Sequence, residues 1–172
     1  MSEMNDPSPS SPTGSDWPQR LPRRASRMMV PRALADDPGL VTVDATWGKI
    51  QPNELAAGVR TIAELELITH LRAGLELVDS RRTEQFSAAT IVGARSLPHG
   101  ELPERIGELD SSRPTIFFCN GPQCAATPSA VSALLNAGYP AQAILYYRGG
   151  LHDWITLGLP TVRGGSMSLA EI

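Results

Sequence analysis

The chain has 172 residues, enough for one ordinary domain, and a hydrophobic share of 41% with a mean hydropathy of -0.14 fits a globular protein. Its net charge of -3 gives no basic footprint for nucleic-acid binding, and its apolar runs are far shorter than the roughly 20 residues of a membrane span. Two cysteines are too few for a disulfide framework or a structural metal site, and the N-terminus lacks the apolar stretch of a secretory signal. We therefore expect a cytoplasmic protein whose cysteines remain thiols.

Proline, serine and arginine dominate the first part of the chain, and a segment of this composition buries too little apolar surface to fold. The prolines of this part are Pro7, Pro9, Pro12, Pro18, Pro22, Pro31 and Pro38. Residues 1–38 are therefore predicted to form a disordered tail. A domain over residues 39–163 is expected to follow, with a second tail over residues 164–172.

The domain is predicted to begin with short β-like pieces at 40–45 and 50–52. Residues 61–74 have the apolar pattern of a helix that ends at a glycine. Thr61 and Glu64 have the Thr-x-x-Glu spacing of a capping box, in which each side chain bonds the backbone N–H of the other residue. The helix is therefore expected to start at Thr61.

Strands and helices then alternate along the rest of the domain. Strands are predicted at 75–79, 93–98, 115–118 and 142–147, and helices at 83–89, 101–110, 128–137 and 149–158. Thr127 followed by Pro128 has the residue types of an N-cap and a first helical position. The alternation predicts an α/β fold with a mostly parallel sheet and helices on both faces, and such sheets carry ligand sites at the carboxyl ends of their strands.

Both cysteines lie in one loop at such a strand end, within the stretch TIFFCNGPQCAATP. Cys119 directly follows the strand, and Gly121 and Pro122 let the chain curl so that successive backbone N–H groups form an anion cradle. With a helix N-terminus beside it, this cradle is expected to lower the pKa of the Cys119 thiol and make it a nucleophile. The alternative is that Cys119 is a buried apolar residue without a chemical role.

Several further motifs stand in the order of a known family. Asp79-x-Arg81 ends the strand after the first helix, and IVGARSLP covers residues 91–98. A C-terminal signature consists of Gly149, Gly150, Trp154, Gly158 and Pro160. Together with the cysteine loop, these motifs make residues 61–162 resemble a single rhodanese-homology domain.

The resemblance implies a five-stranded parallel sheet between helices and a sulfurtransferase that needs no metal or organic cofactor. Cys119 would be the catalytic residue, taking a sulfane sulfur from a small donor to become a persulfide. The sulfur would then pass to a thiophilic acceptor such as cyanide or a protein thiol. The candidate substrate-binding residues are Asn120, Gly121, Pro122, Gln123, Cys124, Ala125, Ala126, Thr127, Arg81 and Arg148.

The cysteine loop departs from the common family pattern, because it is longer and contains no Arg or Lys. A related subset of the family carries the sequence CNGPQC itself. Thiosulfate is a dianion, and a loop without a cation makes thiosulfate an unfavourable donor. Relatives of the phosphatase type bind their oxyanion with a loop arginine, which this loop lacks. Arg148 is either the best substitute cation or a solvated surface residue. Arg81 belongs to a pair that more often ties the sheet of this family to neighbouring loops.

Other roles stay open. Cys124 either resolves an oxidised or persulfidated Cys119 as a disulfide or only packs in the loop. His152 and Asp153 are neighbours on a short helix and are expected to point apart.

The leading hypothesis is a sulfurtransferase with a Cys119 persulfide. The alternatives are a non-enzymatic binding or regulatory module, and a thiol reductase or phosphatase-like enzyme that uses Cys119 and Cys124.

Overall fold

The computed structural model describes residues 32–33, 41–42 and 50–164. Nearly all of both predicted tails lies outside these residues. In the N-terminal part, β1 (Arg32–Ala33) pairs antiparallel with β2 (Val41–Thr42). Strand β2 falls within the first predicted β-like piece, whereas the second piece, at 50–52, forms no strand.

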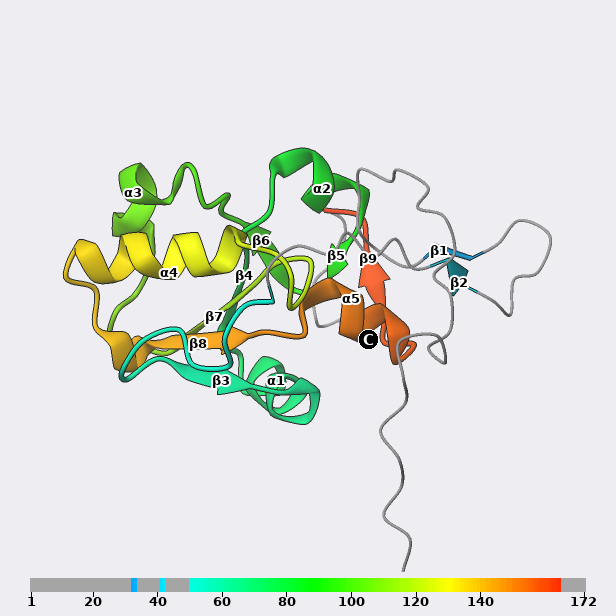
Figure 1. Cartoon of the computed structure of the whole chain (residues 1–172), viewed down its shortest axis with the longest axis horizontal. Helices are drawn as coiled ribbons and strands as arrows, with labels where there is room; N and C mark the ends of the chain where they lie inside the picture. The colour runs from blue at the N-terminus through cyan, green and yellow to red at the C-terminus, as the bar shows by residue number, and fades with distance from the viewer. Residues whose placement is uncertain (1–31, 34–40, 43–49, 165–172) are drawn as a thin grey trace, which may run out of the picture.

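A five-stranded parallel sheet forms the centre of the fold (Figure 1). Its strands are β3 (Arg60–Ile62), β4 (Glu76–Asp79), β6 (Ala94–Ser96), β7 (Thr115–Phe118) and β8 (Ile144–Tyr147). They lie in the order β3-β8-β7-β4-β6, and every neighbouring pair is parallel. The predicted sheet is confirmed, and its topology brings the carboxyl ends of β4, β7 and β8 to one edge.

Helices cover both faces of this sheet. They are α1 (Glu64–Arg72), α2 (Thr83–Ala88), α3 (Leu102–Arg105), α4 (Ala126–Asn136) and α5 (Gly150–Thr156), with 3-10 turns η1 (Ile106–Glu108) and η2 (Ala141–Ala143). In Figure 1, α3 and α4 lie on one side of the strands and α1 lies on the other. The predicted helices are all present, although the one expected over 101–110 is divided into α3 and η1.

The central strands alternate their side chains between two cores. Phe117 and Tyr146 face the core that includes side chains of α3 and α4. Ile116, Phe118 and Tyr147 face the core that includes side chains of α1 and α5. All five are fully buried. Strands that are buried on both faces are apolar at every position, which explains why these segments form continuous apolar runs in the sequence.

The helix start predicted at Thr61 is wrong, because Thr61 belongs to β3. It pairs with Tyr146 of β8, and its hydroxyl donates a hydrogen bond to the carbonyl oxygen of Asn53. Helix α1 begins at Glu64, with Ala63 as its N-cap and no side-chain cap bond. Pairing along the sheet edge keeps residue 61 extended, so tertiary structure overrides the local capping signal.

One further strand pair was not predicted. Strands β5 (Thr90–Ile91) and β9 (Thr161–Val162) pair antiparallel. Each has only two residues, too few to show an alternating pattern in the sequence. The pair joins the chain after α5 to the segment that follows α2.

Candidate active site

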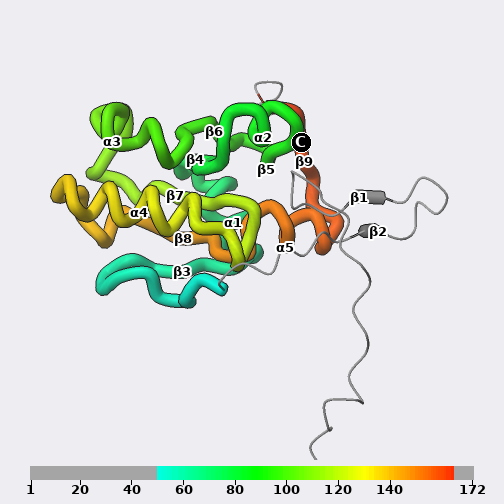
Figure 2. Tube along the Cα trace, turned by 45° about the horizontal axis from the view of Figure 1, so that its top comes forward, coloured from blue at the N-terminus to red at the C-terminus, as the bar shows by residue number. Residues whose placement is uncertain are grey.

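The cysteine loop lies where β7 ends and α4 begins, at the carboxyl edge of the sheet. Cys119 is 1% exposed and Cys124 is half-buried, and both are free thiols. Of the other predicted loop residues, Gln123 is half-buried and Ala125 is exposed. Figure 2 shows the loop that leads into α4 and helix α5 at the same end of the sheet. The loop therefore occupies the edge at which parallel sheets carry ligand sites.

Backbone hydrogen bonds to the first turn of α5 hold this loop in shape. The N–H of Leu151 donates to the carbonyl oxygen of Cys119 at 2.9 Å, and the N–H of His152 donates to that of Asn120 at 2.8 Å. Within the loop, the N–H of Cys124 donates to the carbonyl oxygen of Gly121 at 2.9 Å. These three bonds engage the carbonyl oxygens of residues 119–121 and fix the path of the loop.

Gly150 makes the close contact between α5 and the loop possible. Its φ is +61°, and a Cβ at this position would lie 2.4 Å from the carbonyl oxygen of Cys119 and 2.7 Å from the backbone nitrogen of Gly121. Both the left-handed backbone and the close approach exclude a side chain. The glycine pair in the C-terminal signature thus has a local structural cause.

The two thiols contact each other. The Cys119 thiol donates a hydrogen bond to the carbonyl oxygen of Cys124, with its Sγ 3.6 Å from that oxygen. The neighbouring Cys119 side chain is the largest influence that lowers the pKa of Cys124. The backbone N–H groups of Ala126 and Asn120 and the charge of Arg81 act in the same direction, so the pKa of Cys124 falls to about 6.

Burial has the opposite effect on Cys119. Removal from water raises the pKa of its thiol, and the adjacent Cys124 raises it further, while the hydroxyl and N–H groups of Thr127 favour the ionised form. At neutral pH the negative charge of the pair therefore lies on Cys124, and Cys119 keeps its proton. Burial therefore acts against the lowered pKa that the sequence predicted for Cys119.

The lowered pKa of Cys124 predicts how this residue reacts with iodoacetamide. Only the thiolate is alkylated, so we expect the rate to rise from pH 5 to pH 7, with its midpoint near pH 6, and then to level off. Mass spectrometry after timed quenching measures the rate. The Cys124→Ser variant, which retains Cys119 alone, is expected to react slowly even at pH 8. A Cys124 midpoint above pH 8, where ordinary thiols titrate, would contradict the assignment.

Arg81 lies behind the loop in a buried network. Its Nε and Nη2 donate to the Asp79 carboxylate at 2.9 and 2.6 Å, and its Nη1 donates to Oδ1 of Asn120 at 3.2 Å. The hydroxyl of Thr90 donates to the same carboxylate at 2.8 Å. Sequence reasoning named Arg81 as a candidate substrate-binding residue and favoured a structural role that ties the sheet to neighbouring loops. Its side chain is 1% exposed and supports Asn120 from inside the protein.

Arg148 fastens the segment before β3 to the sheet edge. Its Nε and Nη2 donate to the carbonyl oxygen of Gln51 at 3.0 and 2.9 Å. The N–H of Gln51 donates in turn to the carbonyl oxygen of Pro122 at 2.7 Å. The guanidinium, for which the sequence left open a role as substitute cation or as a solvated surface group, thus donates to the backbone. Sequence reasoning missed Gln51, whose bonds to Arg148 and Pro122 join residues distant along the chain.

Two buried hydroxyl groups near the cysteines have no hydrogen-bond partner among the described residues, those of Thr127 and Tyr146. The N-cap role predicted for Thr127 is wrong, because α4 begins one residue earlier with Ala125 as its cap. Burial, followed by the nearby thiols, raises the pKa of Tyr146, so its hydroxyl stays protonated. Sequence reasoning missed Tyr146, although it lies on the strand next to β7.

His152 and Asp153 do not point apart as predicted. The Nδ1 atom of His152 lies 2.9 Å from Oδ1 of Asp153, because the short carboxylate reaches back to the neighbouring ring. A Cβ added to Gly121 would lie 3.1 Å from the Cβ of His152. The pair therefore lies against the outer side of the cysteine loop.

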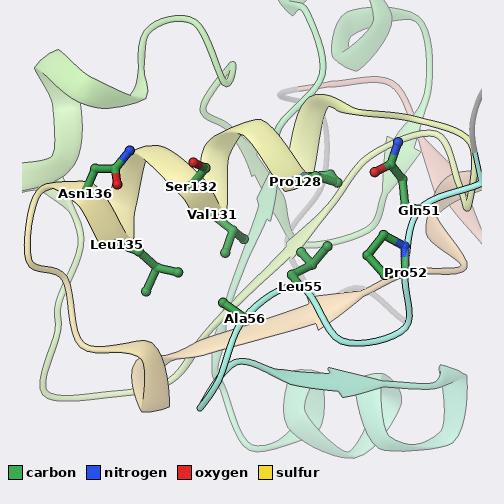
Figure 3. Close-up of a pocket in the computed structure, with 9 residues that line it drawn as sticks. All are labelled: Gln51, Pro52, Leu55, Ala56, Pro128, Val131, Ser132, Leu135 and Asn136. Atoms are coloured by element: carbon green, nitrogen blue, oxygen red, sulfur yellow. The ribbon is translucent and has the colours of Figure 1, made fainter.

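A pocket of about 340 Å³ adjoins the loop, between α4 and the segment before β3. Figure 3 shows Val131 and Leu135 of α4 pointing toward Leu55 and Ala56 on the opposite side. Gln51 lines one end of the pocket and also bonds Pro122, so this residue connects the pocket to the loop. None of the lining residues is charged.

Within the part of the chain that the structure describes, no three His, Cys, Asp or Glu side chains gather as a metal site requires. Among the same residues, no helix has both the length and the apolar character needed to cross a bilayer.

The parallel sheet with a cysteine loop at its carboxyl edge is a fold of the sulfurtransferase type. Residues 63–157, more than half of the chain, match the rhodanese-like domain family. The chain therefore belongs to the rhodanese-like domain family, as its sequence motifs suggested.

Three similar proteins illustrate the range of this family. The HTH-type transcriptional regulator Rv0324 of Mycobacterium tuberculosis is 34% identical over 104 residues, which are 60% of this chain and 45% of the regulator. A thiosulfate sulfurtransferase from Pseudomonas aeruginosa is 28% identical with a TM-score of 0.52, over 64% of this chain and 21% of that protein. The rhodanese-like domain of the Anabaena protein Alr3790 is 26% identical with a TM-score of 0.51, over 59% of this chain and 77% of that domain. This chain thus spans less than half of the regulator's length.

Proposed function

We propose that this protein is a sulfurtransferase, which takes a sulfane sulfur from a donor and passes it to a thiophilic acceptor through a persulfide on Cys119. The observation that carries the proposal is the pair of contacting thiols, Cys119 and Cys124, held by loop amides at the sheet edge. Membership of the rhodanese-like family supports it. So does the similarity to a protein named thiosulfate sulfurtransferase.

The thiol pair suits this chemistry because it carries one proton and one negative charge at neutral pH. A thiolate of the pair attacks the sulfane sulfur of the donor, a new S–S bond forms, and the rest of the donor leaves with the electrons of the broken bond. An acceptor thiolate or cyanide then attacks the terminal sulfur of the Cys119 persulfide and restores the thiol. The unpartnered hydroxyl of Thr127, beside Cys119, is a hydrogen-bond donor for that persulfide.

The charges around the loop favour a donor other than thiosulfate. The Cys124 thiolate repels a dianion, and the two arginines nearest the loop, Arg81 and Arg148, are engaged with Asp79 and with the backbone of Gln51. The pocket beside the loop has no charged lining residue. We therefore propose an organic persulfide as the donor.

Intact-mass measurement of the full chain tests this proposal. After incubation with glutathione persulfide we expect a gain of one sulfur atom, at least about tenfold faster than with thiosulfate at equal concentration, because the electrostatic cost of bringing a dianion to a thiolate is at least about 1.4 kcal/mol. Mercaptopyruvate is the third donor of the series. Faster loading from thiosulfate would contradict the donor assignment, and no gain from any donor would contradict the function.

A non-enzymatic regulatory module is the second candidate, because a relative with 34% identity is named a transcriptional regulator. In this case sulfur loading leads to no transfer. This candidate is favoured if neither the wild type nor Cys119→Ser transfers sulfur to cyanide or to thiols, whichever donor is used. A thiol reductase that uses both cysteines would instead form a mixed disulfide with its substrate, which Cys124→Ser traps.

We further propose that residues 39–163 form the functional unit and that it works in the cytoplasm. Strand β9 extends to Val162 and pairs with β5, which supports the C-terminal limit. Two free cysteines suit a reducing compartment. The loop sequence also supports placing the chain in the CNGPQC subset of the family.

A further inference from the structure

The two cysteines differ in how a donor from solvent can reach them. Cys119 is 1% exposed and lies behind the loop, at the end of the buried strand β7. Cys124 is half-buried, five residues further along the loop, and is the more accessible of the two thiols. A donor that approaches the sheet edge therefore meets Cys124 first.

The Cys124 sulfur also occupies the anion cradle of the loop. The backbone N–H groups of Ala126 and Asn120 and the Cys119 side chain favour its ionised form, and so does the charge of Arg81, which donates a hydrogen bond to Asn120. A sulfur in this position has the two properties that a nucleophile needs, a stabilised anionic form and an open side. Cys119 has no open side, and its burial disfavours the anionic form.

We propose that Cys124 is the catalytic residue that takes the sulfane sulfur from the donor, and that it passes this sulfur inward to Cys119. The inference rests on the proposed sulfurtransferase function and adds the entry step to it. In the first step the Cys124 thiolate attacks the outer sulfur of an organic persulfide, R–S–SH. A bond forms between that sulfur and the Cys124 Sγ, the bond to R–S breaks, and R–S⁻ leaves with the electron pair.

The second step moves the sulfur between the two contacting side chains. The Sγ of Cys119 attacks the outer sulfur of the Cys124 persulfide, and the bond from that sulfur to the Cys124 Sγ breaks. The proton of Cys119 passes to Cys124, so that Cys119–SH and Cys124–S–SH become Cys119–S–SH and Cys124–SH. The transferred sulfur keeps its oxidation state, and no oxidant or reductant is consumed.

The surroundings of Cys119 suit a store for the transferred sulfur. The residue is buried, so only an acceptor that binds at the cysteine loop reaches the outer sulfur of its persulfide. The Thr127 hydroxyl is fully buried beside it and has no hydrogen-bond partner among the described residues. A persulfide on Cys119 supplies the acceptor that this hydroxyl lacks.

Single-cysteine variants of the full chain separate entry from storage. Each protein is mixed with glutathione persulfide, quenched with iodoacetamide at successive times, and analysed as intact protein and as peptides. We expect Cys119→Ser to gain one sulfur on Cys124 at a rate within about threefold of wild type, because serine still donates a hydrogen bond. We expect Cys124→Ser to load Cys119 at least about tenfold more slowly. In wild type, the label is expected on Cys124 first and on Cys119 later.

Several results would overturn the relay. Cys124→Ser loading at the wild-type rate, or Cys119→Ser loading tenfold more slowly while its circular dichroism and thermal unfolding match wild type, would make Cys119 the entry thiol. An internal disulfide with release of sulfide would show that Cys119 attacks the inner sulfur instead. If the wild type gains no sulfur from any donor, it is the proposed function that fails. Cys119→Ala, which removes the hydrogen bond, is the matched control for Cys119→Ser.

Discussion

Gly150→Ala is expected to destabilise the fold by more than about 2 kcal/mol and to slow sulfur loading by about 100-fold. The methyl group would lie 2.4 Å from the carbonyl oxygen of Cys119 and 2.8 Å from the carbonyl carbon of Asn120, and both are backbone atoms that no rotamer change can move. The loop has to shift away from α5, which breaks the bond from the N–H of Leu151 to Cys119. Urea unfolding measures the first effect, and mass-resolved loading measures the second.

Gly158→Ala is the matched control, because it separates backbone conformation from the close contact. Gly158 has a φ of +71°, similar to the +61° of Gly150, but nothing lies within 4 Å of a Cβ at this position. This control is expected to lose about 1–2 kcal/mol for the left-handed conformation and to load sulfur normally. If both variants behave alike, the contact between Gly150 and the loop has no special role.

The central part of the fold could be predicted from the sequence because its strands are buried on both faces. Runs such as 115–118 are apolar throughout, and helices with clear breaks separate them, so the parallel sheet follows. The edges of the fold were less predictable. Thr61 has a good capping signal but pairs with β8, and Thr127 has the residue type of a cap but lies inside α4. In both cases contacts distant in the sequence decide the local conformation.

The location of the candidate site was also predictable, whereas its electrostatics were not. A strand end, a glycine-containing loop and a helix start predicted converging amides near Cys119. Which sulfur these amides face depends on the depth of each side chain below the surface, and the sequence carries no signal for this depth. In the structure Cys119 is the more deeply buried thiol, and backbone N–H groups favour the ionised form of Cys124. The thiol with the lowered pKa is therefore Cys124 and not Cys119, for which it was predicted. Gln51 was not predicted for a similar reason, because its partners are Arg148, which follows β8, and Pro122 of the loop.

Arg81→Met is expected to destabilise the protein by about 3–5 kcal/mol, which corresponds to a fall in Tm of roughly 10 °C or more. The substitution leaves the Asp79 carboxylate, 0% exposed, without the guanidinium that neutralises it, and it removes the donor to Oδ1 of Asn120. It also takes away a charge that favours the Cys124 thiolate. The midpoint of Cys124 alkylation is therefore expected to move above pH 6, toward the value of an ordinary thiol.

Two further variants show whether the uncompensated carboxylate is the cause. Replacing both partners, as Asp79→Leu with Arg81→Met, removes the buried charge altogether and is expected to be more stable than Arg81→Met alone. Arg95→Met is the surface control. It breaks ion pairs of Arg95 with Glu76 and Glu108 at partly exposed side chains, and solvent screening makes its expected loss small. If the double variant is no more stable than Arg81→Met, packing of the arginine side chain, and not its charge, stabilises the loop.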